Sequence, residues 1–325
     1  MELNEFIKTE LNPSLNETAF FMGNGLNNFC KTTSSWKSLL IDLAQKHVSN
    51  SDDFEKILDE KEITYPEFYD IIQLTTNQDY KLIKKEISIG LDKWIYLNTH
   101  KLWMDMFIKT DRPVLTTNYD LLLEKSNPDL IKFIKSNRSK KKSFRPLMTT
   151  KKGFTAIYPW HSYYSYKRIN NSLGEFGIWH IHGISEYFQS IRLGLCDYMG
   201  IVERAVNWLR NIKRNNLNND WIGNNSWVNI LLNCNICFVG IDLGTQETSL
   251  RWLLIEREKY FKLNEDKRKK GWYILDKQNN MQFPEGKRLF LEKLGITIIE
   301  AEKTTDIYEL MPKRIKKQVK KQGLK

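Results

Sequence analysis

An amide and a carboxylate stand two residues apart at the end of a short apolar run, as Asn118 and Asp120 after Val114–Leu115. The run predicts a β-strand, and the apolar pattern of residues 121–125 predicts a helix directly after it. In open α/β sheets, ligands bind at the carboxyl ends of such strands. An amide both donates and accepts hydrogen bonds, so Asn118 could orient a hydroxyl group and a water molecule together. The alternative is a plain connecting turn in which Asp120 caps the helix.

Two further apolar runs end in glycine-containing loops. Phe20–Met22 runs into Gly-Asn-Gly-Leu-Asn at residues 23–27, and Ile236–Val239 runs into Gly-Ile-Asp-Leu-Gly at residues 240–244. Because glycine has no Cβ, the backbone can approach a ligand closely at both places. Amide N–H groups near a helix start can also cradle a pyrophosphate. The match of the first loop to the dinucleotide fingerprint is partial, since Asn28 stands in place of the third glycine.

A fourth strand is expected at Ile178–Ile181, and it is followed by His182 and Gly183. A neutral imidazole can take a proton from water or from a hydroxyl group near pH 7. Residues two apart lie on the same face of a strand, so we expect His180 and His182 to point to one side. Spacing therefore leaves open which imidazole acts. The alternative is that His182 simply ends a strand.

The elements that must position these residues alternate between strands and helices. Such alternation predicts an α/β fold with a Rossmann-like parallel sheet and helices on both faces. An interval of about residues 34–110 separates the first two strands and is too long for one crossover helix, so we interpret it as a helical insertion. Its helices are expected at Trp36–His47, Asp52–Leu58, Tyr65–Leu74, Tyr80–Leu91 and Lys93–Ile108. Further strands are expected at Thr155–Pro159, Trp272–Leu275 and Ile296–Ile299.

The composition is typical of a globular protein without a membrane segment. The chain has 325 residues, of which 41% are hydrophobic, enough for one large α/β domain with an insertion or for two domains. No apolar run reaches the roughly 18 residues of a membrane span, and the acidic, polar start is unlike a secretory signal. Four cysteines do not suggest a disulfide scaffold. A cytoplasmic location is therefore expected.

Positive charge is concentrated at the end of the chain. The formal net charge is +11, and residues 313–325 hold seven Lys and Arg and no acid, which leaves the rest of the chain at +4. We interpret residues 311–325 as a basic C-terminal tail that could contact nucleic acid, an acidic partner or anionic lipid. The alternative is a solvated end that aids solubility. A basic helix is favoured there by the helical spacing of Met311, Ile315 and Val319.

Four motifs follow one another along the chain: the glycine loop at residues 23–27, Thr-Thr-Asn-Tyr-Asp at 116–120, His-Ile-His-Gly at 180–183 and Gly-Ile-Asp-Leu-Gly at 240–244. This order resembles the sirtuin family, and more closely its bacterial NAD-hydrolysing branch in antiphage defence. The resemblance implies that residues 1–310 form one sirtuin-like NAD-binding catalytic domain. It also implies hydrolysis of NAD to nicotinamide and ADP-ribose, which depletes NAD after infection.

The resemblance gives each motif residue an expected role. Asn118 would orient the ribose hydroxyls and a water molecule, Asp120 would orient Asn118 or the ribose, and His182, which precedes glycine, would be the base. The other motif residues would bind NAD: Gly23, Asn24, Gly25 and Asn27 at the pyrophosphate and adjoining ribose, Gly240 and Asp242 at the adenosine end, and Thr117 as a further contact. Asn27 and Asp242 depart from the family pattern, which usually has Ser at the first place and often at the second.

The cysteines bear on which sirtuin activity to expect. Deacetylating sirtuins typically carry a four-cysteine zinc module, whereas Cys234 and Cys237 have Cys-x-x-Cys spacing that Cys30 and Cys196 do not complete. We therefore expect NAD as substrate and no metal. Rival interpretations are an NAD-dependent protein deacylase, a non-enzymatic subunit that binds NAD or ADP-ribose, and a nucleic-acid-acting partner subunit.

Because the catalytic domain accounts for nearly all of the chain, its regulator is expected elsewhere. The resemblance implies either a partner such as a HerA-like ATPase or self-assembly into a homo-oligomer.

Overall fold

The computed structural model describes residues 1–31, 35–48, 53–60, 62–76, 80–127, 160, 162–166, 169, 171–215, 221, 223–224 and 226–321. The strand expected at Thr155–Pro159 and residues 322–325 of the expected tail lie outside these ranges. Within them, no helix is both long and apolar enough to cross a membrane.

Six strands form one parallel sheet in the order β3-β2-β1-β4-β5-β6. The strands are β1 Thr18–Met22, β2 Pro113–Thr116, β3 Gly177–His180, β4 Asn235–Val239, β5 Gly271–Asp276 and β6 Ile296–Ala301. The chain moves outward from β1 to β3 and then returns to add β4 on the other side of β1. This reversal between β1 and β4 is the place where open α/β sheets bind ligands. The predicted Rossmann-like α/β sheet is confirmed.

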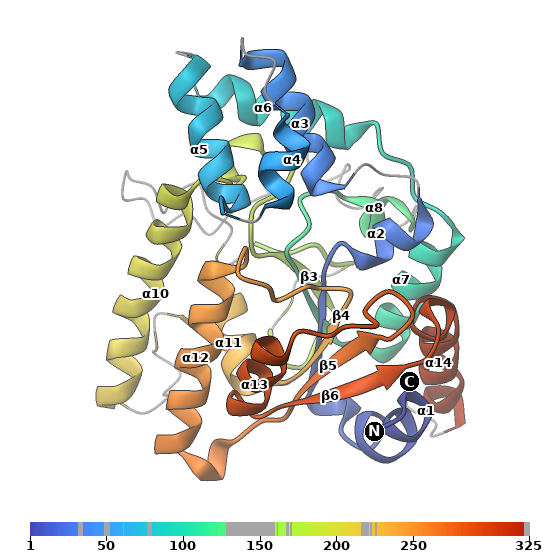
Figure 1. The fold of residues 1–325 in the computed structure, drawn as a ribbon. Helices are drawn as coiled ribbons and strands as arrows, with labels where there is room; N and C mark the ends of the chain where they lie inside the picture. Colours follow the sequence, from blue (N-terminus) through green and yellow to red (C-terminus); the bar gives the residue numbers. More distant parts are fainter. Residues whose placement is uncertain are drawn as a thin grey trace.

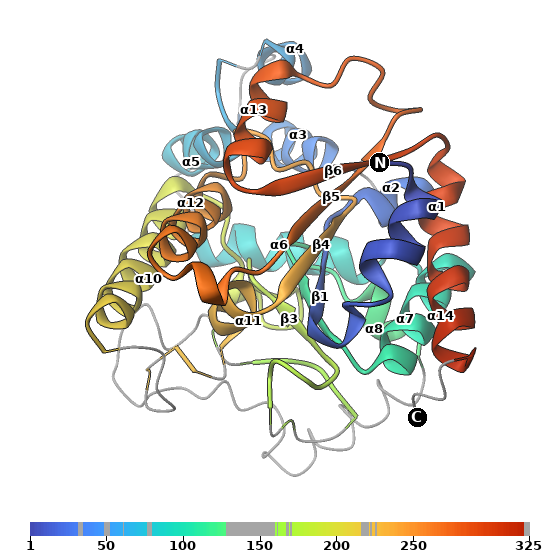
Figure 2. The same ribbon diagram turned by 90° about the horizontal axis from the view of Figure 1, so that it is seen from below.

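Helices cover both faces of the sheet, which explains why its central strands are apolar without interruption (Figure 2). Phe21 and Phe238 face one helical layer, whereas Phe20 and Cys237 face the other. The first layer contains α10 Leu195–Asn215, α11 Trp227–Asn233, α12 Thr248–Leu263 and α13 Glu285–Lys293. The second contains α1 Leu3–Phe6 with its π-helical continuation Ile7–Leu11, α7 Asn98–Thr110 and α14 Met311–Lys321. Two short helices follow strand ends, α2 Gly25–Cys30 and α8 Leu122–Lys125.

The helical insertion forms a separate packed unit beside the carboxyl ends of β2 and β3 (Figure 1). Its helices are α3 Trp36–His47, α4 Phe54–Asp59, α5 Tyr65–Thr76 and α6 Tyr80–Asp92. Their buried side chains pack against one another and against Tyr119, Ile191 and Leu193, which follow those two strands. The insertion therefore lies against the edge of the sheet that the sequence motifs share.

The helix expected at Lys93–Ile108 begins later and belongs to the sheet layer. Residues 93–97 are not helical, and α7 starts at Asn98, where His100 Nδ1 accepts a hydrogen bond from the Leu97 N–H at 3.0 Å. Trp103 of α7 is fully buried in the layer under the sheet. The apolar spacing of residues 93–97 was misleading because Trp94 packs into the insertion instead of continuing the helix.

The expected basic tail begins as a packed helix. Met311, Ile315 and Val319 of α14 are at most 2% exposed, and α14 packs along α7. Lys316 Nζ lies 3.1 Å from the Asp105 carboxylate of α7. The helical spacing is therefore confirmed, but through residue 319 this segment is part of the folded domain and not a solvated end. Contact of its charges with nucleic acid stays a prediction.

Candidate functional site

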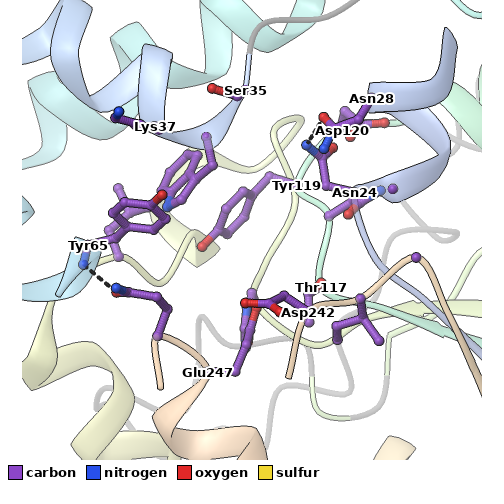
Figure 3. Close-up of a pocket in the computed structure, with 18 of the residues that line it drawn as sticks. Asn24, Asn28, Ser35, Lys37, Tyr65, Thr117, Tyr119, Asp120, Asp242 and Glu247 are labelled. Atoms are coloured by element: carbon purple, nitrogen blue, oxygen red, sulfur yellow. Dashed lines mark hydrogen bonds and ion pairs between the residues drawn. The ribbon is translucent and has the colours of Figure 1, made fainter. Parts of the chain in front are cut away.

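A cavity of about 350 Å³ lies at the carboxyl ends of the central strands, between the sheet and the insertion (Figure 3). The loops after β1, β2, β3 and β4 all contribute to its wall, as do α3, α5 and α6 of the insertion. Eight of the residues singled out in the sequence line it: Asn24, Gly25, Thr117, Asn118, Asp120, His182, Gly240 and Asp242. Gly23 and Asn27 do not lie on this wall.

Asn118 is held on the wall of the cavity through its backbone and its side chain. Its N–H donates to Thr116 Oγ1 at 3.0 Å, and its Nδ2 donates to the Gly23 carbonyl at 3.4 Å. Its carbonyl accepts from His180 Nδ1 at 2.7 Å. Within the described part of the chain, no donor binds its side-chain oxygen. The amide is thus fixed in place while keeping an acceptor for a ligand.

Asp120 binds Asn27 and not Asn118. Asp120 Oδ2 accepts from Asn27 Nδ2 at 2.9 Å, and Oδ1 accepts from the Leu122 N–H at 3.0 Å, which is the helix-capping contact of the simpler interpretation. Burial raises the pKa of Asp120. The expected orientation of Asn118 by Asp120 is therefore wrong for this structure, although Asp120 does reach the cavity wall.

Asn27 is buried and connects neighbouring side chains without lining the cavity. It is 1% exposed, and its Nδ2 also donates to Asn24 Oδ1 at 2.8 Å. Its Oδ1 accepts from His100 Nε2 at 3.0 Å, because His100 Nδ1 is occupied by the Leu97 N–H. Burial lowers the pKa of His100 to about 4, so this imidazole is neutral. The ligand contact expected of Asn27 is replaced by a contact that fixes Asn24.

The two histidines of His-Ile-His-Gly point to different places. β3 ends at His180, and the chain turns at residues 181–182, so the same-face rule for strands does not extend to His182. His180 lies against α8, with Nε2 2.8 Å from Glu124 Oε1, and is absent from the cavity wall. His182 lines the cavity and its ring lies near those of Tyr119 and Tyr198. The expectation of a shared face is therefore wrong.

His182 faces an acid that the sequence did not single out. His182 Nε2 lies 3.8 Å from Glu247 Oε2, and the two side chains are 4% and 23% exposed. Neither atom has a hydrogen-bond partner within the described residues. Burial lowers the pKa of His182 to about 3, and burial together with the Asp242 carboxylate raises the pKa of Glu247 to about 7. Near neutral pH the imidazole is therefore uncharged and Glu247 is close to its midpoint.

The glycines of the first loop, Gly23 and Gly25, pack against the backbone of Gly240 in the fourth loop. Gly25 N–H donates to the Gly240 carbonyl at 2.7 Å. A Cβ on Gly25 would overlap Tyr308 Oη and lie 2.6 Å from Gly240 Cα, and Gly240 has φ +64°. A Cβ on Gly23 would lie 2.5 Å from Gly240 O. The expected close approach exists, but protein backbone fills it, so the Gly25 N–H is not free to cradle a pyrophosphate.

A second cavity of about 760 Å³ adjoins the first beyond the Gly25–Gly240 contact. It lies at the carboxyl ends of β4 and β5 and is lined by polar side chains such as Asn279 and Thr304. Both cavities share Gly25, Asn28, Gly240, Ile241 and Asp242. Asp242 is 76% exposed and pairs with Lys287 Nζ at 2.6 Å. The two spaces together offer a site that is long enough for more than a single small group.

Several wall residues carry chemistry that the sequence motifs missed. Glu247 lies three residues beyond the Gly-Ile-Asp-Leu-Gly loop, where α12 begins, so extending that motif toward the helix would have found it. Tyr119 lies inside a quoted motif, and its Oη donates to the Arg192 carbonyl at 2.6 Å. Tyr65 comes from the insertion, and its N–H donates to Gln246 Oε1 at 2.6 Å (Figure 3). No sequence signal marks a wall residue that only tertiary packing brings to the site.

The pair Cys234 and Cys237 does not converge on one point. Cys234 belongs to the apolar cluster on one face of the sheet and Cys237 to the cluster on the other. Both are buried, as expected for packing residues. Among the described residues, no three His, Cys, Asp or Glu side chains gather in a metal-binding arrangement.

No protein-family model matches this chain, and no curated protein matches it either. The site must therefore be interpreted from its geometry and its motifs.

Proposed function

We propose that this protein hydrolyses NAD to nicotinamide and ADP-ribose. The observation that carries the proposal is the meeting of Asn118 and His182 on one cavity wall, at the reversal of strand order between β1 and β4. Asn118 comes from the loop after β2 and His182 from the loop after β3. The adjoining second cavity supports a ligand with two distinct ends. NAD is such a ligand, and the order of the four motifs points to it.

The reaction breaks the bond between nicotinamide and the anomeric carbon of its ribose. The bonding electron pair moves to the ring nitrogen and removes its positive charge, so the leaving group needs little acid assistance. The ribose gains positive character, and the protein must hold it and place a water on its open face. Asn118 is suited to this because its backbone is fixed while its side-chain oxygen stays available to hydroxyl groups.

The rest of the ligand would extend toward the loop after β4. Asn24, Asn28 and Thr117 present polar groups to the first cavity, and Gly240 and Asp242 lie at the boundary with the second. We place the nicotinamide ribose beside Asn118 and the adenosine end beyond Gly240. Pyrophosphate contacts would come from the polar side chains, because Gly25 uses its N–H within the protein.

The biological role proposed for this activity is NAD depletion in antiphage defence. A HerA-like ATPase partner, or assembly of several copies of the chain, would supply the control. This part of the proposal rests on the motif order alone.

The test is direct incubation of the purified protein with NAD, followed by chromatography of nicotinamide and ADP-ribose. Wild-type protein should release both in equal amounts, and Asn118→Ala should lose at least about a hundredfold in kcat while staying folded. Asn264→Ala is the matched control, because its amide binds the Tyr260 carbonyl away from the cavity. Turnover of Asn118→Ala within about threefold of wild type would remove the assigned role.

Two further arms separate the rival functions. An acyl-lysine peptide that is deacylated with NAD consumption would favour a deacylase. Calorimetric titration with ADP-ribose tests binding without turnover: saturable binding by a wild type that does not cleave NAD would favour a binding subunit. A wild type that neither cleaves NAD nor binds ADP-ribose would contradict both readings of the site.

A further inference from the structure

Two buried polar atoms of the cavity wall face each other without a hydrogen-bond partner among the described residues. His182 Nε2 and Glu247 Oε2 lie 3.8 Å apart, and each lacks a hydrogen bond within the described part of the chain. Buried polar groups in folded proteins are nearly always hydrogen-bonded, so each such exception calls for an explanation. Here both exceptions line the same cavity. They come from different loops, the one after β3 and the one after β4, and meet only there.

The separation of these atoms fits a small oxygen-containing group between them. At 3.8 Å they are too far apart for a direct hydrogen bond. An oxygen placed about 2.8 Å from each would bridge them with an angle of about 85° at the oxygen. A water molecule in this position would donate one hydrogen to the carboxylate and one to the imidazole. A lone pair of the water then points away from both, free to attack.

We propose that Glu247 and His182 hold the attacking water of the hydrolysis between them and that Glu247 takes its proton. This inference rests on the proposed function. In the step, the water oxygen bonds to the anomeric carbon as the bond from that carbon to nicotinamide breaks. The electron pair of the broken bond goes to the ring nitrogen, and the water proton goes to the Glu247 carboxylate, which later releases it to solvent.

The environment of the pair supports the carboxylate as the base. Tyr119 and Tyr198 face it from the loop after β2 and from α10, and Asp242 faces it from the same loop as Glu247. Neither tyrosine is charged near neutral pH, since burial raises the pKa of both hydroxyls. With a pKa of about 7 for Glu247 and about 3 for His182, the proton rests on the carboxylate and the imidazole stays a neutral orienting group.

The inference changes the role that the motif order gives to His182. The histidine becomes the group that positions the water, and the proton acceptor is an acid outside the quoted motifs. A substitution of either residue should then lower kcat far more than it changes the KM for NAD, because both act on the water and not on NAD itself.

The first experiment measures kcat against pH for wild type, Glu247→Gln and Glu247→Asp. Wild-type kcat should rise with pH through a midpoint near 7 and then level off, because only the ionised carboxylate accepts a proton. Glu247→Gln should lose about a hundredfold or more in kcat, show no such rise, and keep KM within about threefold. Glu247→Asp should recover part of the rate and the pH-dependent rise. Glu292→Gln, an exposed glutamate of α13, is the control.

Glu247→Gln with kcat within about threefold of wild type, or with the same midpoint near 7, would overturn the inference. A second measurement does not require NAD cleavage. In protein with ¹⁵N-labelled histidine, assigned through His182→Gln, the His182 Nε2 resonance should shift with a midpoint near 7 as Glu247 ionises. Glu247→Gln should abolish that shift.

The two measurements distinguish the two proposals. Absence of the resonance shift in wild type would overturn the pairing of Glu247 with His182, even in an active enzyme. A wild type that shows the shift but does not cleave NAD would contradict the proposed function and leave the pair as a proton-binding unit of another reaction.

Discussion

Both ring nitrogens of His180 face hydrogen-bond acceptors, the Asn118 carbonyl at 2.7 Å and Glu124 Oε1 at 2.8 Å. An imidazole that donates from both nitrogens carries a positive charge. Burial alone would lower the pKa of His180, but the Glu124 carboxylate and these hydrogen bonds outweigh it and raise the pKa. Its surroundings therefore favour the charged form of His180, which fixes the backbone of Asn118, and its contribution belongs to stability and positioning.

We predict that His180→Ala destabilises the protein by about 3–5 kcal/mol, because it leaves Glu124 buried and unpaired. His182→Gln should change the free energy of unfolding by about 1 kcal/mol or less, since His182 Nε2 has no hydrogen bond to lose among the described residues. Urea denaturation at pH 6 measures both. Equal losses of stability in the two variants would contradict the distinct surroundings of these histidines.

The pH dependence of stability follows from the sign of the His180 shift. Because its folded pKa is raised, the ion pair stabilises fully below the unfolded value of 6.5 and loses this contribution as pH rises through the folded pKa. The double variant His180→Gln with Glu124→Gln has no charge there. We predict that the stability difference between wild type and this variant falls from pH 6 to alkaline pH. A constant difference, measured by urea denaturation, would refute the buried cation.

Residue identity predicted only part of the site. Asn118 could be placed on the cavity wall because it directly follows an apolar strand, and open α/β sheets bind ligands at the carboxyl ends of their strands. The difference between His180 and His182 depended on a turn at residues 181–182, which the spacing of two histidines does not reveal. Asn27 was misassigned because an amide satisfies a buried network as readily as it binds a ligand. Glu247 was missed because a glutamate at a helix start is common.

At the scale of elements, the loops after β1 and β4 depend on their contact at Gly25 and Gly240. We predict that Gly25→Ala costs about 1–3 kcal/mol and abolishes ADP-ribose binding, since its Cβ would overlap Tyr308 and Gly240 and push the two loops apart. Gly286→Ala on α13 is the matched control, because in the described part of the chain nothing beyond its sequence neighbours and its own helix backbone lies within 4 Å of the added Cβ. The control should be neutral or slightly more stable. Thermal unfolding and calorimetric titration measure both effects.

The last helix, α14, carries many lysines but also packs buried apolar side chains against the domain. We predict that Ile315→Ala, at a fully buried position of α14, costs about 2–5 kcal/mol in the free energy of unfolding. Lys317→Ala, on the exposed side of the same helix, should stay within about 0.5 kcal/mol of wild type. A cost below about 1 kcal/mol for Ile315→Ala would restore the interpretation of this segment as a solvated tail.

The strands and most helices could be predicted because burial on both faces leaves uninterrupted apolar runs such as Phe20–Met22. The start of α7 could not be predicted, since Trp94 has helical spacing but packs into the insertion. The place of α14 could not be predicted either. Three apolar residues among many lysines suit a packed helix and a frayed one equally well, and only contact with α7 decides between them.

At the scale of the whole molecule, the positions of the cysteines predict the zinc content of the purified protein. Cys234 and Cys237 lie in the apolar clusters on opposite faces of the sheet. A zinc ion needs its ligands within about 2.3 Å of one point, which such a pair does not provide. We predict less than one-tenth of a zinc ion per chain in protein purified without chelator. One zinc per chain, by elemental analysis, would revive the deacylase interpretation.

The wall of the first cavity is contributed by residues from Asn24 to Glu247. A chain that leaves the ribosome in order therefore carries Asn118 and His182 well before Glu247 can stand opposite them. Fragments that end before the loop after β4 would likewise lack Glu247. Under the proposed function, synthesis itself would withhold the assembled site until most of the sheet is in place, so incomplete chains would not hydrolyse NAD in the cell that makes the protein.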